Sequence, residues 1–233
     1  MIDSISSSGR EQNTALDEPV QIPSEGETLH GDLSVPTAAT GIVIFAHGSG
    51  SSRFSSRNRF VADVLQLGGI ATLLLDLLTP REELVDMRTR EHRFNIDLLA
   101  ARVASAIDWA RHDHRTVSLP VGLFGASTGA AAALVAAASL GYRIRAVVSR
   151  GGRPDLAGAS LGHVTAPTLF IVGENDPEVL RLNRMSQSIM SAPTSVVVIP
   201  RASHLFEEGD TLEQAAIAAR DWFLRWLPAY ATH

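Results

Sequence analysis

Short apolar runs alternate with amphipathic stretches along most of this chain. Two early segments, residues 20–22 and 29–35, read as strands, and the second alternates between apolar and other side chains as a half-exposed antiparallel strand does. The pattern predicts an α/β fold with a mixed, mostly parallel sheet of about eight strands and the two opening strands exposed at its edge. The remaining runs are almost unbroken in their apolar character, as strands covered by helices on both faces require, and they are residues 42–45, 71–75, 121–124, 144–148, 168–172 and 195–199.

Amphipathic helices are predicted between these strands. Apolar side chains recur at three- and four-residue spacing in residues 60–67, 96–107 and 212–227, and Pro228 then ends the last helix. Residues 77–95 form a longer and more charged connection, which fits either a small lid or a surface loop. Apart from that connection, helices and strands alternate as the α/β class requires.

A single domain is expected, because no internal repeat or linker divides the sequence. The chain has 233 residues, of which 45% are hydrophobic and 19% charged, so it is long enough to bury a substantial core. Residues 1–17 are polar and rich in serine. We expect them to form a disordered lead-in, followed by one α/β domain over residues 18–233.

The amino-acid composition argues against several classes of binding partner and of catalytic chemistry. The formal net charge is −5 and no basic stripe occurs, which argues against nucleic acid as a partner. The absence of cysteine excludes disulfides, thiolate catalysis and cysteine–zinc sites. The start of the chain has no secretory-signal pattern, and no run of about 18 apolar residues occurs. A cytoplasmic protein without a membrane segment is therefore expected.

A candidate nucleophile lies in the pentapeptide of residues 125–129, which fits G-x-S-x-G with Ser127 at its centre. The predicted strand 121–124 precedes it, and an alanine-rich helix is expected over residues 130–140. A serine on such a tight strand-to-helix turn is held in a strained backbone conformation that exposes its hydroxyl. The competing interpretation is a chance match in an ordinary turn. Its position between strand and helix favours a nucleophile.

A candidate general base follows the last predicted strand. Serine is a poor nucleophile at its free pKa and needs a base within hydrogen-bond reach. His204 lies in the loop after residues 196–199, and the carboxyl ends of parallel strands converge on one edge of the sheet, where Ser127 also lies. The alternative is a solvated loop histidine without a catalytic role.

Asp176 is the preferred acid to orient that histidine, because it follows the predicted strand 168–172. Glu174, two residues earlier, and Asp155, after the preceding strand, compete for the role. An aspartate that precedes a proline could also cap a helix, and the two functions can coexist. The chain order serine, aspartate, histidine agrees with that of α/β-hydrolases.

Backbone N–H groups are needed to bind the oxyanion that forms when serine adds to a carbonyl. Thr128, directly after the nucleophile, is expected to supply one, and Ser49 in the glycine-rich loop 47–52 the other. This loop matches neither the Walker pattern nor G-x-G-x-x-G, so a nucleotide site is not expected. A flexible turn remains the alternative, and His47 is expected to have a structural function below the loop.

These motifs together resemble the dienelactone-hydrolase-like branch of the α/β-hydrolases, and the likeness extends from about residue 20 to residue 227. It is particularly similar to hydrolase domains that elsewhere are fused to a phosphoribosyltransferase domain. The resemblance implies the eight-stranded fold, a triad of Ser127, Asp176 and His204, and little or no cap domain. The best-known members use a cysteine nucleophile, whereas this chain has serine there. Hydrolysis of carboxylic esters is therefore a safer expectation than hydrolysis of dienelactone itself.

The leading hypothesis is a serine hydrolase that cleaves small carboxylic esters through an acyl-enzyme intermediate, without metal or organic cofactor. Arg53, Arg150 and Arg153 fall on loops expected to border the site, and guanidinium groups bind carboxylate or phosphate, so an anionic substrate is a further hypothesis. The same residues are compatible with an amidase or peptidase, or with a catalytically silent ligand-binding protein. The expected partner is a small ester, and a homodimer is left open.

Overall fold

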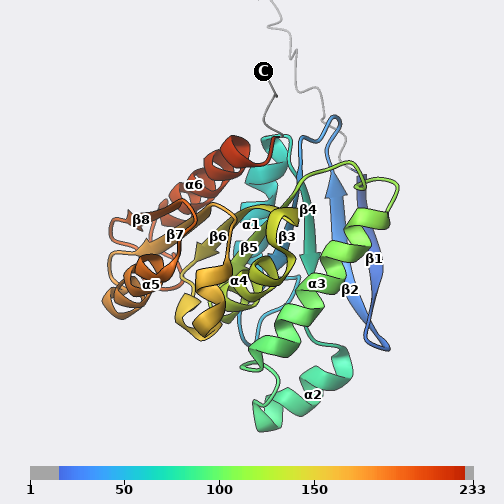
Figure 1. Cartoon of the computed structure of the whole chain (residues 1–233), viewed down its shortest axis with the longest axis horizontal. Helices are drawn as coiled ribbons and strands as arrows, with labels where there is room; N and C mark the ends of the chain where they lie inside the picture. Colours follow the sequence, from blue (N-terminus) through green and yellow to red (C-terminus); the bar gives the residue numbers. More distant parts are fainter. Residues whose placement is uncertain (1–15, 229–233) are drawn as a thin grey trace, which may run out of the picture.

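A computed structural model describes residues 16–228 of the chain. Its strands form one eight-stranded sheet in the order β1-β2-β4-β3-β5-β6-β7-β8 (Figure 1). The predicted α/β fold with a mostly parallel sheet of about eight strands is thereby confirmed. The strands are β1 (Leu16–Ser24), β2 (Glu27–Val35), β3 (Ile42–Ala46), β4 (Ala71–Leu75), β5 (Val121–Ala126), β6 (Ile144–Arg150), β7 (Thr168–Gly173) and β8 (Thr194–Ile199).

Only one of the two opening strands lies at an edge of the sheet. β2 pairs antiparallel with β1 on one side and with β4 on the other, and all later pairings are parallel. The second edge is β8, whose side chains are half-buried from Thr194 to Val198. The prediction that both opening strands are edges was therefore wrong. Apolar and other side chains alternate along β2 because one face of the strand is more deeply buried than the other. This difference between the two faces does not require the strand to lie at an edge of the sheet.

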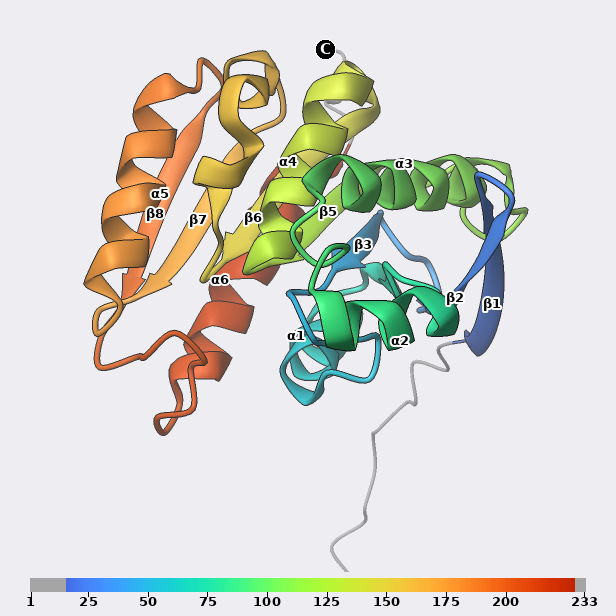
Figure 2. The same ribbon diagram turned by 90° about the horizontal axis from the view of Figure 1, so that it is seen from below.

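Helices cover both faces of the sheet, as Figure 2 shows from the end of the molecule where α2 lies. On one face lie α3 (Ile96–His112), α4 (Thr128–Leu140) and α5 (Pro177–Ile189). On the other lie α1 (Ser56–Leu67) and α6 (Thr211–Trp226). Two short 3₁₀ segments and one further helix complete the described chain: η1 (Gly141–Arg143), η2 (Pro154–His163) and α2 (Pro80–Thr89).

Two apolar layers fill the space between sheet and helices. Leu73 and Phe170 lie in the layer between the sheet and helices α3 and α4. Phe45 and Phe124 lie in the layer on the opposite face, between the sheet and helices α1 and α6, and the centroids of these two rings are 4.7 Å apart. In α4 the residues that face the sheet are mostly alanines, so this helix approaches the sheet closely. This close approach determines the geometry of the turn that precedes α4.

The segment 77–95 contains an ordered helix rather than a bare loop. Thr79 caps α2: its hydroxyl accepts the N–H of Glu82, and the Glu82 carboxylate accepts the N–H of Thr79. Pro80 occupies the first turn, where its missing N–H has no cost. This capping box was the overlooked sequence signal for a helix at this position.

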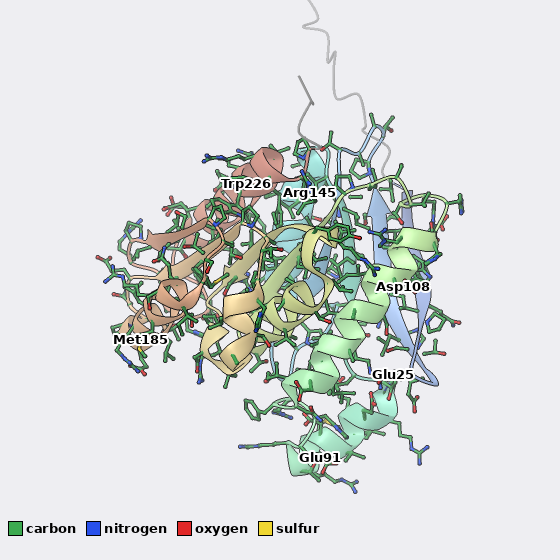
Figure 3. The ribbon with its side chains drawn as sticks, in the orientation of Figure 1. Glu25, Glu91, Asp108, Arg145, Met185 and Trp226 are labelled. Carbon is green, nitrogen blue, oxygen red and sulfur yellow. The ribbon has the colours of Figure 1, made fainter. Side chains whose placement is uncertain are left out.

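Arg102 on α3 anchors α2 to the rest of the fold. Its buried guanidinium donates to Glu82 at 2.9 Å and to the carbonyl oxygen of Ser24 at 2.8 Å. The side chains in Figure 3 show how α2 lies relative to the sheet: Glu91, just beyond α2, lies at the lower end, whereas Asp108 on α3 and Glu25 in the β1–β2 turn lie along one side. The segment therefore stands at one end of the molecule and is tied to it by a buried arginine.

The ordered domain begins slightly earlier in the sequence than expected. β1 begins at Leu16, two residues before the predicted start at residue 18. The rest of the predicted disordered lead-in lies outside the described residues. Within residues 16–228, no helix is both long and apolar enough to cross a lipid bilayer.

The packing of α6 against the sheet yields a stability prediction. Phe223 is fully buried, whereas the next residue, Leu224, is 39% exposed. We expect Phe223→Ala to lower the free energy of unfolding by about 3–5 kcal/mol in urea titrations, because a large cavity opens in the core. Leu224→Ala, on the same helix, is the matched control and should change it by less than about 0.5 kcal/mol. Equal losses in the two variants would contradict this packing.

Candidate active site

Ser127 occupies a strained turn between β5 and α4. Its φ of 50° and ψ of −123° fall in a region that non-glycine residues rarely adopt. Two backbone hydrogen bonds hold the turn: the Ser127 N–H donates to the Arg150 carbonyl at 3.4 Å, and the Arg153 N–H donates to the Ser127 carbonyl at 3.0 Å. The end of β6 and the loop that follows it therefore hold the backbone N–H and carbonyl of Ser127 in place.

The glycines beside Ser127 are required by close contacts. A Cβ atom on Gly125 would lie 2.4 Å from the Cα of Ala130, and one on Gly129 would lie 2.2 Å from the carbonyl oxygen of Ala46. Real Cβ atoms do not approach other atoms so closely. The G-x-S-x-G pattern thus has a local structural reason, since only hydrogen fits where the strand and helix meet.

His204 and Asp176 form a direct pair in the structure. The His204 Nδ1 lies 2.6 Å from an Asp176 carboxylate oxygen. Asp176 also occupies the N-cap position of α5, yet its side chain makes no capping hydrogen bond. Of the two roles considered for this aspartate, its carboxylate therefore serves the histidine.

The two competing carboxylates have other partners. The Glu174 side chain accepts the N–H of Arg201 at 2.8 Å, and Asp155 forms an ion pair with Arg153 at 2.7 Å. Neither carboxylate is paired with His204 in the structure. The geometry thus favours Asp176 over both of them.

Hydrogen bonds join the loops that carry Asp176 and His204. The Glu174 N–H donates to the Ile199 carbonyl, and the Asn175 N–H donates to the Ala202 carbonyl, both at 2.9 Å. Gly173 lies so close that an added Cβ would be 2.3 Å from the Ala202 carbonyl oxygen. The two loops therefore hold each other at the carboxyl ends of β7 and β8.

Ser127 and His204 line one small cavity of about 180 Å³. Residues from the glycine-rich loop, from the start of α1 and from the end of β6 complete its wall. A larger surface depression of about 820 Å³ lies between the β1–β2 turn and α3, but neither Ser127 nor His204 lines it. The chemistry-bearing side chains thus share the smaller cavity, and we place the candidate site there.

The two predicted oxyanion donors are in contact with each other. The Ser49 N–H donates to the Thr128 hydroxyl at 3.0 Å, and the two hydroxyl oxygens lie 2.9 Å apart. Thr128 is the first residue of α4, where backbone N–H groups lack partners within the helix. No sequence pattern indicates that the Ser49 N–H already has a partner. To bind a substrate oxygen, it must first be released by the Thr128 hydroxyl.

His47 has the structural function expected of it. The Leu77 N–H donates to Nε2 at 3.0 Å, so Nε2 carries no proton, and Nδ1 donates to the Gly48 carbonyl at 2.9 Å. This neutral imidazole joins the glycine-rich loop to the segment after β4. Burial lowers the pKa of His47 below its ordinary value, because the charged form loses its hydration.

The three candidate arginines differ in their surroundings. Arg53 forms ion pairs with Asp76 and Asp32, and Arg153 is paired with Asp155. Neither lines the cavity of Ser127 and His204. Both nevertheless lie on segments that border the site, because the Arg153 N–H donates to the Ser127 carbonyl and Arg53 directly follows the glycine-rich loop. Their sequence positions gave no indication of these carboxylate partners.

Arg150 does line the cavity, and two residues of α1 line it as well. Arg57 and Asn58 were not among the predicted site residues. They follow the glycine-rich loop within a few positions, at the start of a helix that begins at the same edge of the sheet. That placement was the signal that could have identified them.

Comparison with known proteins agrees with this architecture. The model of the dienelactone hydrolase family matches residues 32–231. This chain belongs to the dienelactone hydrolase family. The crystal structure of a dienelactone hydrolase from Anabaena variabilis is 53% identical, with a TM-score of 0.90, and the match covers 91% of this chain and 99% of that one.

Two further comparisons extend the picture. Two Mycobacterium tuberculosis proteins named "Putative phosphoribosyl transferase" are 56% identical over 208 residues, which is 89% of this chain and 46% of theirs. The chain thus spans about half the length of these curated relatives. Est1E from Butyrivibrio proteoclasticus has a TM-score of 0.74 at 16% identity, covering 89% of this chain and 98% of Est1E, and shares the fold. The family and these neighbours identify a hydrolase fold.

The buried His47 yields a prediction about pH. In the unfolded chain this histidine takes up a proton near pH 6.5, whereas the folded protein resists protonation until the pH is lower. The unfolded state therefore binds more protons in that window, and the folded state loses stability as the pH falls below about 6.5. We expect the drop in unfolding free energy between pH 7.5 and pH 5.5, measured in urea, to be smaller in His47→Gln than in the wild type.

The exposed His112 on α3 provides the control for this experiment. His112→Gln should keep the pH dependence of the wild type. Superimposable pH profiles for the wild type and His47→Gln would contradict the assignment of a neutral, buried imidazole at position 47.

Proposed function

We propose that this chain hydrolyses small carboxylic esters through an acyl-enzyme formed on Ser127. The observation that supports this most is the 2.6 Å contact of His204 with Asp176, together with the shared cavity of His204 and Ser127. A carboxylate on Nδ1 keeps the proton there and leaves the Nε2 lone pair for the serine hydroxyl. The volume of about 180 Å³ favours small substrates, since drug-sized ligands occupy larger pockets.

In the acylation step, the Ser127 Oγ adds to the ester carbonyl carbon while His204 Nε2 takes the hydroxyl proton. The carbonyl oxygen becomes an oxyanion and accepts the backbone N–H of Thr128, joined by that of Ser49 once the Thr128 hydroxyl has moved. Collapse of the tetrahedral intermediate breaks the bond to the alkoxy oxygen. His204 gives its proton to that oxygen, and the alcohol leaves.

Deacylation repeats these proton transfers with water. His204 takes a proton from water as the water oxygen adds to the acyl carbon. The bond to the Ser127 Oγ then breaks, the proton returns to that oxygen, and the carboxylic acid is released. Throughout, the Asp176 carboxylate stabilises the imidazolium.

The names of the curated relatives do not determine the chemistry of this chain. They refer to phosphoribosyl transfer, and this chain corresponds to 46% of those proteins. The dienelactone hydrolase model extends from residue 32 to residue 231, and the match to these relatives covers 89% of this chain, so the two matched portions largely overlap. We therefore propose hydrolysis for this portion.

The proposed nucleophile is tested by covalent labelling. We expect a fluorophosphonate to add one phosphonyl group to Ser127, detected by peptide mass spectrometry, and 4-nitrophenyl acetate to be hydrolysed with a burst when deacylation is slow. Ser127→Ala should lose both labelling and turnover. Ser188→Ala, an exposed serine on α5, is the matched control and should retain both. Wild-type protein that neither reacts with the phosphonate nor hydrolyses the ester would support a silent ligand-binding protein instead.

The role of Asp176 is tested by removing its charge alone. Asp176→Asn keeps the size of the side chain but no longer fixes the tautomer of His204, so we expect kcat to fall by about 10³–10⁴-fold. Glu174→Gln, two residues away, should stay near the wild-type rate. A large loss in Glu174→Gln, with a near-normal rate in Asp176→Asn, would transfer the orienting role to Glu174.

A further inference from the structure

A buried aspartate on α2 fastens the loop that follows this helix. Asp86 has an exposed fraction of 3% and is the one buried residue of α2. Its carboxylate accepts the backbone N–H groups of His92 and Arg93, both at 2.9 Å, and the Nε–H of Arg93 at 2.6 Å. Its carbonyl oxygen accepts a further guanidinium N–H of Arg93 at 3.2 Å. We refer to these two paired residues as the Asp86–Arg93 clamp.

The clamp keeps its charge at neutral pH. Burial alone would raise the pKa of Asp86, but the hydrogen bonds from Arg93 and His92 outweigh burial and hold the pKa below its ordinary value. The carboxylate therefore stays ionised and continues to accept these N–H groups. An interaction of this kind, with a charged acceptor and several donors, fixes the loop more firmly than a neutral hydrogen bond does.

The clamp is in contact with the glycine-rich loop 47–52. The Arg93 carbonyl oxygen accepts the hydroxyl of Ser49 at 3.2 Å. A Cβ atom on Gly50 would lie 3.8 Å from a terminal nitrogen of Arg93, so the guanidinium also lies beside this loop. Asp86 and Arg93 both line a narrow gap whose other wall is the glycine-rich loop. The clamp therefore connects α2 to the loop that carries the predicted oxyanion donor.

The hydrogen bonds between Ser49 and Thr128 have a fixed direction. A carbonyl oxygen can only accept, so the Ser49 hydroxyl proton points to Arg93. The Ser49 oxygen then accepts the Thr128 hydroxyl at 2.9 Å, and the Thr128 oxygen accepts the Ser49 N–H at 3.0 Å. An unbroken chain of hydrogen bonds thus extends from the Asp86 carboxylate, through Arg93, to the Ser49 N–H.

The segment 77–95 holds the glycine-rich loop at two points. Near the start of the segment, the Leu77 N–H donates to His47. Near its end, Arg93 accepts the Ser49 hydroxyl. Glycine permits many backbone conformations, so the shape of this loop depends on such contacts. An oxyanion donor must be in place before the negative charge develops, and a misplacement of about 1 Å can slow a reaction about a hundredfold.

We propose that Asp86 and Arg93 are positioning residues, which act through Ser49 to hold its backbone N–H where the oxyanion forms. This inference rests on the proposed ester hydrolysis and gives the segment 77–95 a role in it. The Thr128 hydroxyl occupies the Ser49 N–H before the reaction. The oxyanion then replaces this neutral acceptor with a charged one, and hydrogen bonds to charged acceptors are roughly twice as strong. The clamp keeps Ser49 in place during that exchange.

A second clamp of the same kind provides a matched control. The Asp113 carboxylate accepts the backbone N–H of Arg115 at 2.9 Å and its Nε–H at 2.7 Å. The side chain of Arg115 is 16% exposed, and that of Arg93 is 21% exposed. Arg115 lies in the loop that leads into β5, whereas Ser127 follows the other end of this strand. Loss of the second clamp therefore affects stability without affecting the glycine-rich loop.

The kinetic experiment compares Arg93→Met with Arg115→Met. Acylation and deacylation both pass through an oxyanion, so both steps should slow in Arg93→Met. We expect kcat for 4-nitrophenyl acetate to fall about tenfold or more, with KM within about threefold of the wild type, because the lost interaction belongs to the transition state. Arg93→Lys keeps a charged donor for Asp86 and should recover part of kcat. Arg115→Met should keep the wild-type kcat. A wild-type kcat in Arg93→Met, or equal losses in the two methionine variants, would overturn the inference.

Hydrogen exchange tests the positioning of the loop without turnover. The Ser49 amide should exchange slowly in the wild type, and at least about tenfold faster in Arg93→Met, as measured by NMR. Ser49→Ala keeps the N–H but removes the link to Arg93, and should also speed its exchange. Arg115→Met should not. Unchanged exchange in Arg93→Met would overturn the inference even if esters are hydrolysed. If exchange responds as expected but the wild type neither hydrolyses esters nor is labelled at Ser127, the proposed function fails, and with it the catalytic role of the clamp.

Discussion

The close approach of β5 and α4 is the constraint on which the site depends. Hydrogen atoms at Gly125 and Gly129 leave just enough room for the strand and helix to meet. At this turn Ser127 adopts a positive φ, a conformation that costs on the order of 1–3 kcal/mol. Backbone hydrogen bonds to Arg150 and Arg153 hold the strained residue in place. The end of β6 and the loop after it therefore help to hold Ser127 in its strained conformation.

The remaining groups reach the site because parallel strands end at one edge of the sheet. β7 and β8 deliver Asp176 and His204, and hydrogen bonds between their loops hold the two in register. β3 delivers the glycine-rich loop, which the neutral His47 fastens from below. β6 delivers Arg150, the one member of the set whose charge is unmatched within the described residues. The fold thus brings Ser127, Arg150 and His204, the last of them paired with Asp176, to the edge of a single small cavity.

Much of this arrangement could be predicted from local sequence. Unbroken apolar runs identify the buried strands, and the motif around Ser127 identifies the turn, because both patterns arise from packing that involves neighbouring residues. The capping box at Thr79 and Glu82 was also local, although it was overlooked. The edge position of β8, by contrast, depends on the order of strands in the sheet, which no single segment specifies.

Long-range contacts were also beyond sequence analysis. Arg53 and Arg150 look alike in sequence, but one meets Asp32 and Asp76 while the other meets no carboxylate among residues 16–228. Likewise, the hydroxyl of Thr128 accepts the N–H of Ser49 only because the fold brings the glycine-rich loop into contact with the start of α4, 79 positions later in the chain. Such pairings depend on the assembled tertiary structure.

A crystal structure of the phosphonylated protein tests the central claim most directly. The account predicts a bond from phosphorus to the Ser127 Oγ, a phosphonyl oxygen that accepts the Thr128 N–H, and His204 Nε2 within hydrogen-bond distance of the modified serine. Phosphonylation at another residue, or a His204 imidazole that stays with Asp176 but points away from Ser127, would contradict it.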